Sequence, residues 1–222
     1  MRLLLVRHAQ TANNVGRALD TAMPGAALTD LGHQQAARLV ARLAGEDPDV
    51  VAASPLMRAQ QTAAPVAAAR GLAVLTLDGL REIAAGALEM RTSAEAIESY
   101  RGVITAWATG ALEVAMPGGS SGREFLDRYD EAVRALEDAG TRAVAVSHGA
   151  AIRTWLAARC LGVGAGMAAD RVLANTGIAV VEGSTRAGVA ADRLARGDPR
   201  RLARPPPGQR LGPESRHASV RE

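Results

Sequence analysis

The sequence of 222 residues contains no lysine, one cysteine and few aromatic residues. The single cysteine, Cys160, excludes an internal disulfide and a cysteine-based zinc site, and it is consistent with a reducing compartment. Aromatic residues make up 2% of the chain, which argues against single-strand nucleic-acid binding because such binders stack bases on aromatic rings. The first apolar run, residues 3–6, is too short for a signal peptide or a membrane span. We therefore expect a cytoplasmic protein with neither nucleic acid nor membrane as its partner.

The composition, 48% hydrophobic and 22% charged, is that of a globular domain. The net charge of +3 is unevenly distributed, since residues 1–195 carry 19 arginines and 20 acidic residues, whereas residues 196–222 carry seven arginines and three acidic residues. The latter segment contains three consecutive prolines and few large apolar side chains, as is typical of a flexible tail. We predict one domain over residues 1–195 and a basic tail over residues 196–222. The tail either has no function or contacts a polyanion weakly.

Short aliphatic runs alternate with stretches of helical spacing. The pattern predicts strands at residues 2–6, 49–53, 72–77 and 142–146, and a terminal hairpin from residues 177–181 and 189–193. It predicts helices at residues 31–43, 94–108, 121–139 and 150–161, and a helix running to residue 70 with Ser54 as its cap and Pro55 in its first turn. This alternation predicts an α/β fold, a three-layer α/β/α sandwich around a mostly parallel sheet.

Several polar residues follow the predicted strands. Arg7 and His8 follow the first strand, Arg58 lies beyond the second, and His148 follows the strand at residues 142–146. In parallel sheets, ligands bind beyond the carboxyl ends of the strands. Guanidinium groups suit phosphate oxygens, and N–H groups at helix starts add further donors. Each residue alone is compatible with a structural role, but together they predict one anion pocket.

These residue types suit phosphoryl transfer. A neutral imidazole can attack phosphorus and form a phosphohistidine, while arginines and a second histidine stabilise the equatorial oxygens in place of a metal. A carboxyl group must protonate the leaving oxygen, and Glu82, just past the third predicted strand, is the best placed carboxyl group.

The same residues belong to a longer ordered set of motifs. The set comprises Leu-Val-Arg-His at residues 5–8 with Thr11 and Asn14, Leu-Thr-x-x-Gly-x-x-Gln-Ala at 28–36, Ser-Pro-Leu-x-Arg-Ala-x-Gln-Thr-Ala at 54–63, Leu-Arg-Glu-Ile at 80–83, Pro-Gly-Gly at 117–119 and Ser-His-Gly at 147–149. The ordered set resembles the histidine phosphatase superfamily, also called phosphoglycerate-mutase-like, over residues 3–182. This resemblance implies the phosphoglycerate-mutase-like fold and an enzyme that needs neither a metal nor another cofactor.

The resemblance also implies a role for each matching residue. His8 is expected to be the phosphorylated nucleophile and Glu82 the proton donor. Arg7, Arg58 and His148 are expected to form the phosphate pocket, and Thr11 and Asn14 to lie near the phosphate or the substrate entrance.

Three positions depart from the family pattern. Ala9 stands where the signature has glycine, which is unfavourable only if that backbone needs a positive φ. Gln10 stands where glutamate is common, and Ser120 stands where glutamate often follows Pro-Gly-Gly. These departures concern substrate contacts more than the chemistry.

Members of this family transfer the phosphoryl group either to water or back to a bound intermediate. Residues 83–90 lack the aromatic and basic residues by which mutases of the glycolytic type hold a small acidic substrate. We therefore predict a phosphatase of the phosphohistidine type that acts on a small phosphorylated metabolite, and a homodimer is compatible with the sequence. A mutase-type phosphotransferase and a non-catalytic module that binds a phosphorylated ligand are the alternatives.

Two segments are expected to shape the pocket mouth. The first is residues 16–27, with Arg17 and Asp20 as candidates. The second is residues 83–104, whose apolar positions are Leu88, Met90, Ile97 and Tyr100.

Overall fold

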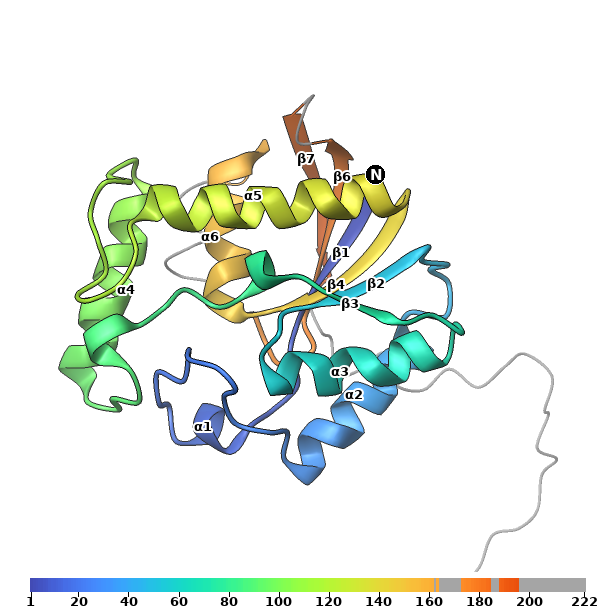
Figure 1. The fold of residues 1–222 in the computed structure, drawn as a ribbon, viewed down its shortest axis with the longest axis horizontal. Helices are drawn as coiled ribbons and strands as arrows, with labels where there is room; N and C mark the ends of the chain where they lie inside the picture. Colours follow the sequence, from blue (N-terminus) through green and yellow to red (C-terminus); the bar gives the residue numbers. More distant parts are fainter. Residues whose placement is uncertain (162, 164–172, 185–187, 196–222) are drawn as a thin grey trace, which may run out of the picture.

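The computed structural model describes residues 1–161, 163, 173–184 and 188–195 (Figure 1). The predicted tail at residues 196–222 lies outside these residues. The strands are β1 (Arg2–Arg7), β2 (Val50–Ala53), β3 (Val74–Thr76), β4 (Arg142–Ser147), β5 (Cys160–Leu161), β6 (Ile178–Ser184) and β7 (Gly188–Ala195). The helices are α1 (Ala12–Val15), α2 (Asp30–Arg42), α3 (Met57–Ala68), α4 (Ala94–Ala108), α5 (Gly122–Ala139) and α6 (Gly149–Arg159), with the 3-10 helices η1 (Asp78–Leu80) and η2 (Gly86–Leu88).

The described strands form a sheet in the order β3-β2-β4-β1-β6-β7-β5. The pairs β1–β4, β2–β4 and β2–β3 are parallel, whereas β6 runs antiparallel to both β1 and β7. These pairings confirm the mostly parallel sheet and the terminal hairpin predicted from the sequence. Because β1 lies between β4 and β6, the segment that follows β1 lies at the edge of the sheet between the ends of these two strands.

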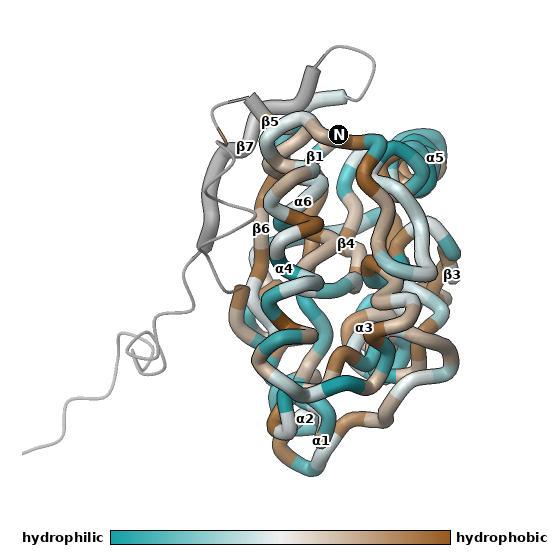
Figure 2. Tube along the Cα trace, turned by 90° about the vertical axis from the view of Figure 1, so that its left-hand side faces the viewer, coloured by the Kyte–Doolittle hydropathy of each residue, from teal (hydrophilic) through white to brown (hydrophobic). Residues whose placement is uncertain are grey.

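Helices cover both faces of the sheet, as the three-layer prediction requires (Figure 1). Leu3 and Leu5 of β1 pack into the core shared with α4, α5 and α6, while Leu4 and Val6 pack into the core shared with α2 and α3. Successive side chains of a strand point to opposite faces, so one aliphatic run serves both cores. In Figure 2, β4 and β6 are mostly hydrophobic, and the visible turns of α5, seen nearly end-on, are largely hydrophilic.

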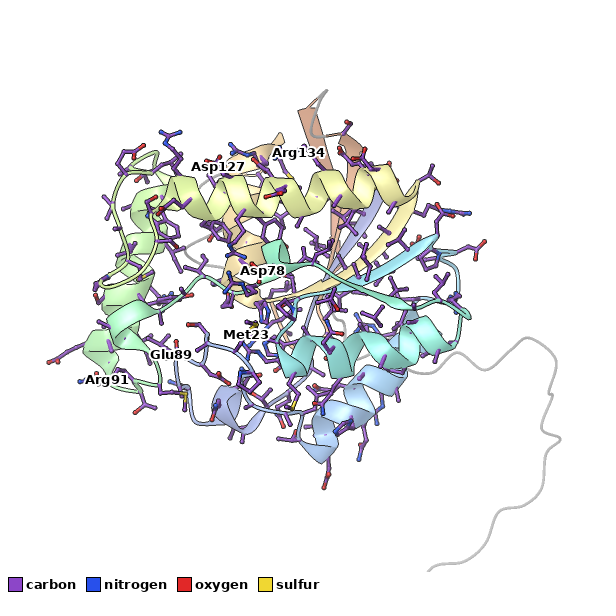
Figure 3. The ribbon with its side chains drawn as sticks, in the orientation of Figure 1. Met23, Asp78, Glu89, Arg91, Asp127 and Arg134 are labelled. Carbon is purple, nitrogen blue, oxygen red and sulfur yellow. The ribbon has the colours of Figure 1, made fainter. Side chains whose placement is uncertain are left out.

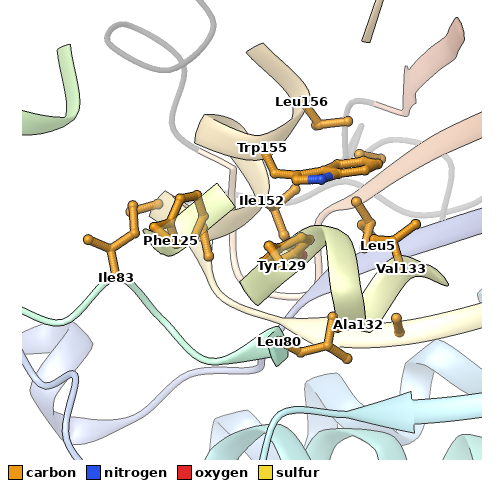
Figure 4. Packing of buried hydrophobic residues seen from close by; sticks show 14 of the residues in the cluster. Leu5, Leu80, Ile83, Phe125, Tyr129, Ala132, Val133, Ile152, Trp155 and Leu156 are labelled. Atoms are coloured by element: carbon orange, nitrogen blue, oxygen red, sulfur yellow. The ribbon is translucent and has the colours of Figure 1, made fainter. Parts of the chain in front are cut away.

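All five aromatic residues of the chain, counting Phe, Trp and Tyr, lie in the core beneath α4, α5 and α6. Trp107, Phe125, Tyr129 and Trp155 form a continuous series with ring centroids 5.6–6.0 Å apart, and three of them are seen in Figure 4. Tyr100 is also buried and donates a hydrogen bond from its hydroxyl to the Ile83 carbonyl. The few aromatic residues are thus used for packing.

Two helices have the boundaries predicted from the sequence. The helix predicted at residues 94–108 is α4, and α5 follows its N-cap Ser121 and ends at Ala139. The Ser121 hydroxyl accepts the Glu124 N–H, and the Glu124 carboxylate accepts the Ser121 N–H. Such a capping box satisfies backbone donors that would otherwise lack partners, which explains why this boundary is encoded locally.

Two boundary predictions are wrong. Helix α3 begins at Met57 with Leu56 as its N-cap, and Ser54 does not cap it because the Ser54 hydroxyl is bonded to His148 and to the Leu56 N–H. Helix α6 ends at Arg159 rather than at residue 161, because Cys160 turns to an extended conformation and begins the short strand β5. Within the described part of the chain, no helix is long and apolar enough to cross a membrane.

Candidate active site

Strand register brings three loops together at one edge of the sheet. Arg7 is the partner of Ser147 across the β1–β4 pair, so His8 and His148 follow neighbouring strands at the same level. Ser54 follows β2, and its N–H donates to the Val146 carbonyl of β4 at 3.0 Å. The centroids of the two histidine rings lie 5.2 Å apart, with the rings tilted by 57°. The structure therefore places the strand-end residues together as predicted.

His8 is held in one tautomer. Its Nδ1 lies 2.7 Å from the Ala9 carbonyl oxygen, which can only accept, so Nδ1 carries the proton. The lone pair of its Nε2 accepts a hydrogen bond from Arg58 Nε at 3.2 Å. Burial, reinforced by the positive charges of Arg58 and Arg7, holds the pKa of His8 well below the ordinary value for histidine. The imidazole is consequently neutral, with Nε2 as its nucleophilic atom.

The two predicted arginines present buried donors. Arg58 is 2% exposed and donates from Nη2 to the Asp20 carbonyl, while its Nη1 lies 3.5 Å from the Asp20 carboxylate without a hydrogen bond. Arg7 donates from Nη1 to the Leu173 carbonyl, and its buried Nε has no partner. Burial lowers the pKa of both guanidinium groups, and the charge of Glu82 opposes that shift. Arginine remains charged in proteins, so both side chains bring positive charge to the site.

His148 lies behind His8 and is fully buried. Its Nε2 is 2.8 Å from the Ser54 hydroxyl oxygen, and its Nδ1 has no hydrogen-bond partner. Burial, together with the positive charge of Arg58, holds the pKa of His148 well below the ordinary value. The described residues contain four buried side-chain polar atoms without partners, and three of them belong to Arg7, Arg58 and His148.

Glu82 reaches the site from the segment after η1. Its Oε1 accepts the N–H groups of Ile83 and Ala151 at 3.0 and 2.8 Å, and its Oε2 accepts the Ala150 N–H at 3.3 Å. Ala150 and Ala151 lie in the first turn of α6, whose N–H groups have no partners within the helix. These bonds fix Glu82 beside the residues that follow His148. Its Oε2 accepts only the longer hydrogen bond and is the more weakly bonded oxygen.

A cavity of about 310 Å³ opens over this group, and His8 and Glu82 lie on its wall. Its lining residues are Arg7, His8, Asn14, Ala18, Leu19, Asp20, Thr21, Arg58, Glu82, Tyr100, Arg101, Gly149, Ala150 and Arg153. Asp20 and Tyr100 line it as the predicted mouth segments suggested, whereas Arg17, Leu88, Met90 and Ile97 do not. The cavity is therefore walled by residues 18–21 on one side and by α4 on another.

Sequence reasoning missed Arg153 and Arg101. Arg153 lies four residues after Gly149 on α6, so helical spacing places both residues on one face, a signal the sequence carried. A Cβ atom at Gly149 would lie 3.2 Å from Arg7 Nε and 3.4 Å from Arg153 Nη1. The glycine after His148 thus lets two guanidinium groups approach the same point, and no comparable pattern marks Arg101.

The two residues expected at the entrance have different positions. Asn14 lines the cavity, and its Oδ1 accepts hydrogen bonds from the Thr11 N–H and from Asn175 Nδ2. Thr11 is fully buried as the N-cap of α1, does not line the cavity and stabilises the turn that carries Asn14. Asn175, which the sequence reasoning missed, also donates to the His8 carbonyl at 3.0 Å and so supports the backbone of His8.

The three departures from the family pattern place no side chain on the cavity wall. Ala9 is fully buried, and its φ is not positive, so its methyl group causes no backbone strain. The Gln10 side chain accepts from the Thr29 hydroxyl, and Ser120 accepts the Met116 N–H through its carbonyl. Neither residue lines the cavity. Among the described residues, no group of three or more His, Cys, Asp and Glu side chains is placed to hold a metal ion.

Comparison with known families decides the classification. The family model described as "Histidine phosphatase superfamily (branch 1)" matches residues 3–193. The chain belongs to this family. Its membership confirms the resemblance found in the motifs, the phosphoglycerate-mutase-like fold and the enzyme class of histidine phosphatases.

Two curated relatives are similar over most of this histidine phosphatase. The PE-PGRS family protein PE_PGRS11 of Mycobacterium tuberculosis is 36% identical over an alignment of 201 residues that covers 82% of this chain but 34% of that protein. The chain thus spans about a third of the length of that relative. The probable phosphoglycerate mutase GpmB of Escherichia coli O1:K1 is 30% identical over an alignment of 154 residues that covers 68% of this chain and 71% of that protein.

Solved structures similar to this histidine phosphatase include two named as phosphatases. A mycobacterial glucosyl-3-phosphoglycerate phosphatase in complex with VO3 has a TM-score of 0.70 and 28% identity, covering 86% of this chain and 96% of that chain. The alpha-ribazole phosphatase from Shigella flexneri has a TM-score of 0.69 and 27% identity, covering 87% of this chain and 96% of that chain. The former protein has also been solved with inorganic phosphate.

Proposed function

We propose that this protein is a metal-independent phosphomonoester hydrolase that acts through a phosphohistidine on a small phosphorylated metabolite. The observation that carries the proposal is the set of three buried nitrogens without hydrogen-bond partners, on Arg7, Arg58 and His148, around the neutral His8. Buried donors without partners are costly, and a bound phosphoryl group would supply acceptors for them. The cavity of about 310 Å³ suits a small ligand rather than a macromolecule.

In the first step, the His8 Nε2 lone pair forms a bond to phosphorus while the bond from phosphorus to the ester oxygen breaks. The Arg58 Nε–H, which now donates to that lone pair, turns to a phosphoryl oxygen. The leaving oxygen takes a proton from the carboxyl group of Glu82, and the free alcohol departs. The guanidinium groups of Arg7 and Arg58 stabilise the negative charge on the equatorial oxygens.

In the second step, a water molecule attacks phosphorus and gives a proton to the Glu82 carboxylate. The bond between phosphorus and His8 Nε2 breaks, inorganic phosphate leaves, and both residues return to their starting protonation states. Glu82 therefore acts first as an acid and then as a base, because the first step needs a proton for the leaving oxygen and the second step removes a proton from water. The hydrogen bonds from the first turn of α6 hold its carboxyl group in place for both.

Two alternatives remain distinct from hydrolysis. A mutase would return the phosphoryl group to a bound intermediate, and the relative named as a probable phosphoglycerate mutase favours this possibility. The phosphatase names of the similar solved structures support transfer to water. A non-catalytic module would bind phosphate without turnover, but the five residues expected for catalysis are all present.

Hydrolysis of a generic aryl phosphate in excess chelator tests the proposal. We expect turnover without metal, and loss of turnover in His8→Ala. Turnover that disappears with chelator would refute the metal-independent mechanism, and phosphate binding without turnover would favour the binding module. A panel of phosphorylated metabolites, including a mutase assay with 3-phosphoglycerate, would then separate phosphatase from mutase.

A further inference from the structure

The Ser54 hydroxyl is fully buried at the end of β2. Within the described part of the chain, its oxygen has two hydrogen-bond partners. One is the Leu56 N–H at 3.3 Å, which can only donate, and the other is His148 Nε2 at 2.8 Å. A serine hydroxyl carries one proton and needs one acceptor for it.

These partners decide the direction of the second hydrogen bond. If His148 Nε2 carried a proton, the Ser54 oxygen would face two donors, and its own proton would have no acceptor. If Ser54 donates instead, Nε2 supplies the lone pair, and both Nε2 and the Ser54 hydroxyl are satisfied. The neutral imidazole must then carry its proton on Nδ1. That Nδ1 is the buried atom of His148 without a hydrogen-bond partner.

We propose that Ser54 is a positioning residue that fixes His148 as the Nδ1–H tautomer, and that this N–H is the donor His148 offers to the transferred phosphoryl group. The inference rests on the proposed function, because it assigns the donor to the phosphoryl group held beside His8. Both histidines then share one tautomer but use opposite edges. His8 offers the bare Nε2 because Nδ1–H is bound by the Ala9 carbonyl, whereas His148 offers Nδ1–H because Nε2 is bound by Ser54.

The tautomer is measurable without turnover. We would label the full chain with ¹⁵N-histidine, assign the ring of His148 from the spectrum of His148→Asn, and record long-range ¹H–¹⁵N correlations at pH 8. We expect the pattern of a protonated Nδ1 and an unprotonated Nε2 for His148. The Nε2–H pattern, or a charged ring, would overturn the proposal in the unmodified protein, whatever the variants do.

Variants then test the role of the hydroxyl. In Ser54→Ala, we expect His148 to lose the fixed Nδ1–H tautomer and orthovanadate to bind about a hundredfold more weakly, the scale of losing one donor to a developing oxyanion. Ser54→Thr retains the hydroxyl and should restore the tautomer. Ser93→Ala, which removes the cap of α4 far from His148 in the sequence, is the matched control and should alter neither readout.

The outcomes separate this inference from the proposed function. An unchanged tautomer in Ser54→Ala, even with weaker vanadate binding, would contradict the positioning role. Failure to detect a phosphoenzyme on His8 would refute the reaction, whereas the tautomer of His148 is read from the free protein and stands or falls by its own spectrum.

Discussion

At the scale of the residue, Glu82 both accepts backbone hydrogen bonds and lies on the wall of the cavity. Its carboxyl group accepts three N–H groups, two of them from the start of α6. Those bonds orient the group, and its place on the cavity wall would expose it to the leaving oxygen in the proposed reaction. The same residue thus links the helix after His148 to the proposed proton transfer.

We predict that Glu82→Gln slows substrates with poor leaving groups far more than activated aryl phosphates. Glutamine keeps the shape and one acceptor oxygen but cannot supply a proton, and general acid catalysis contributes about 10²–10⁴-fold. The measurement is kcat/KM for a series of esters with leaving groups of increasing pKa. Equal losses across the series would exclude the proton-donor role.

Thr62 connects the segment after His8 to the helix that carries Arg58. Its buried hydroxyl accepts the Ala9 N–H at 3.0 Å and donates to the Arg58 carbonyl at 2.6 Å. One side chain therefore fixes both the turn after His8 and the first turns of the helix that carries Arg58.

Thr62→Val should lower the free energy of unfolding by about 1–3 kcal/mol, because it leaves the Ala9 N–H buried without a partner. It should also reduce kcat, since His8 and Arg58 lose their common support. Urea unfolding and steady-state kinetics measure the two effects. Thr62→Ser retains the hydroxyl and is expected to recover most of the activity, and a serine variant as impaired as valine would contradict this account.

At the scale of the element, two loops are joined at the cavity mouth. The Glu89 carboxylate, in the segment before α4, accepts the N–H groups of Thr21 and Ala22 at 2.8 and 3.0 Å and the Thr21 hydroxyl. Glu89 and Met23 are labelled on these two loops in Figure 3. The Thr21 hydroxyl also accepts the Ala85 N–H, and backbone hydrogen bonds join Leu19 to Met90 and Arg91.

Glu89→Ala removes the carboxylate that holds Thr21 and Ala22 against the opposite loop, while the backbone hydrogen bonds that join Leu19 to Met90 and Arg91 remain. We predict that KM for a metabolite substrate rises about tenfold, which corresponds to about 1.4 kcal/mol, while kcat changes less. The control is Glu113→Ala, which removes an exposed ion pair with Arg123. A large loss of kcat with unchanged KM would show that the joint supports the chemistry rather than the mouth.

The elements that the sequence predicted well are those with long periodic patterns or local caps. Helix α5 has its capping box and a strongly amphipathic sequence, and β4 contains an unbroken aliphatic run at residues 143–146. The elements α1, η1 and η2 have three or four residues each, too few to establish a period, and were not predicted.

The site residues also divide into those that a local sequence pattern marks and those that it does not. His8, Arg58 and His148 follow predicted strands, and the ordered motifs single them out. Asn175 was missed because its bond to the His8 carbonyl joins positions 167 residues apart, a distance over which no local pattern operates. The sequence favours Ser54 as a helix cap because serine before a helix commonly caps it. The hydrogen bond between the Ser54 hydroxyl and His148 overrides this local preference.

At the scale of the whole molecule, folding buries two neutral histidines. Burial, with the nearby arginines, lowers the pKa of both His8 and His148 relative to the unfolded chain. The unfolded chain therefore binds more protons below pH about 6.5, and the folded state is favoured less as the pH falls. Each histidine contributes a slope of at most about 1.4 kcal/mol per pH unit in that range.

We predict that His148→Gln flattens the decline in unfolding free energy between about pH 6.5 and 5 relative to the unmodified protein. Urea titrations at fixed pH values measure the slope for each variant. His33→Gln is the control, because His33 is exposed on α2. A slope unchanged by His148→Gln would mean that His148 is not buried in its neutral form.

The central claim is that His8 Nε2 receives the phosphoryl group. The most direct measurement is rapid quenching of the enzyme in alkali after mixing with a ³²P-labelled phosphomonoester and excess chelator, followed by peptide mapping. The account predicts an acid-labile phosphate on His8 that forms and decays fast enough for turnover and is missing in His8→Ala. Turnover without such an intermediate, or with the label on another residue, would contradict it.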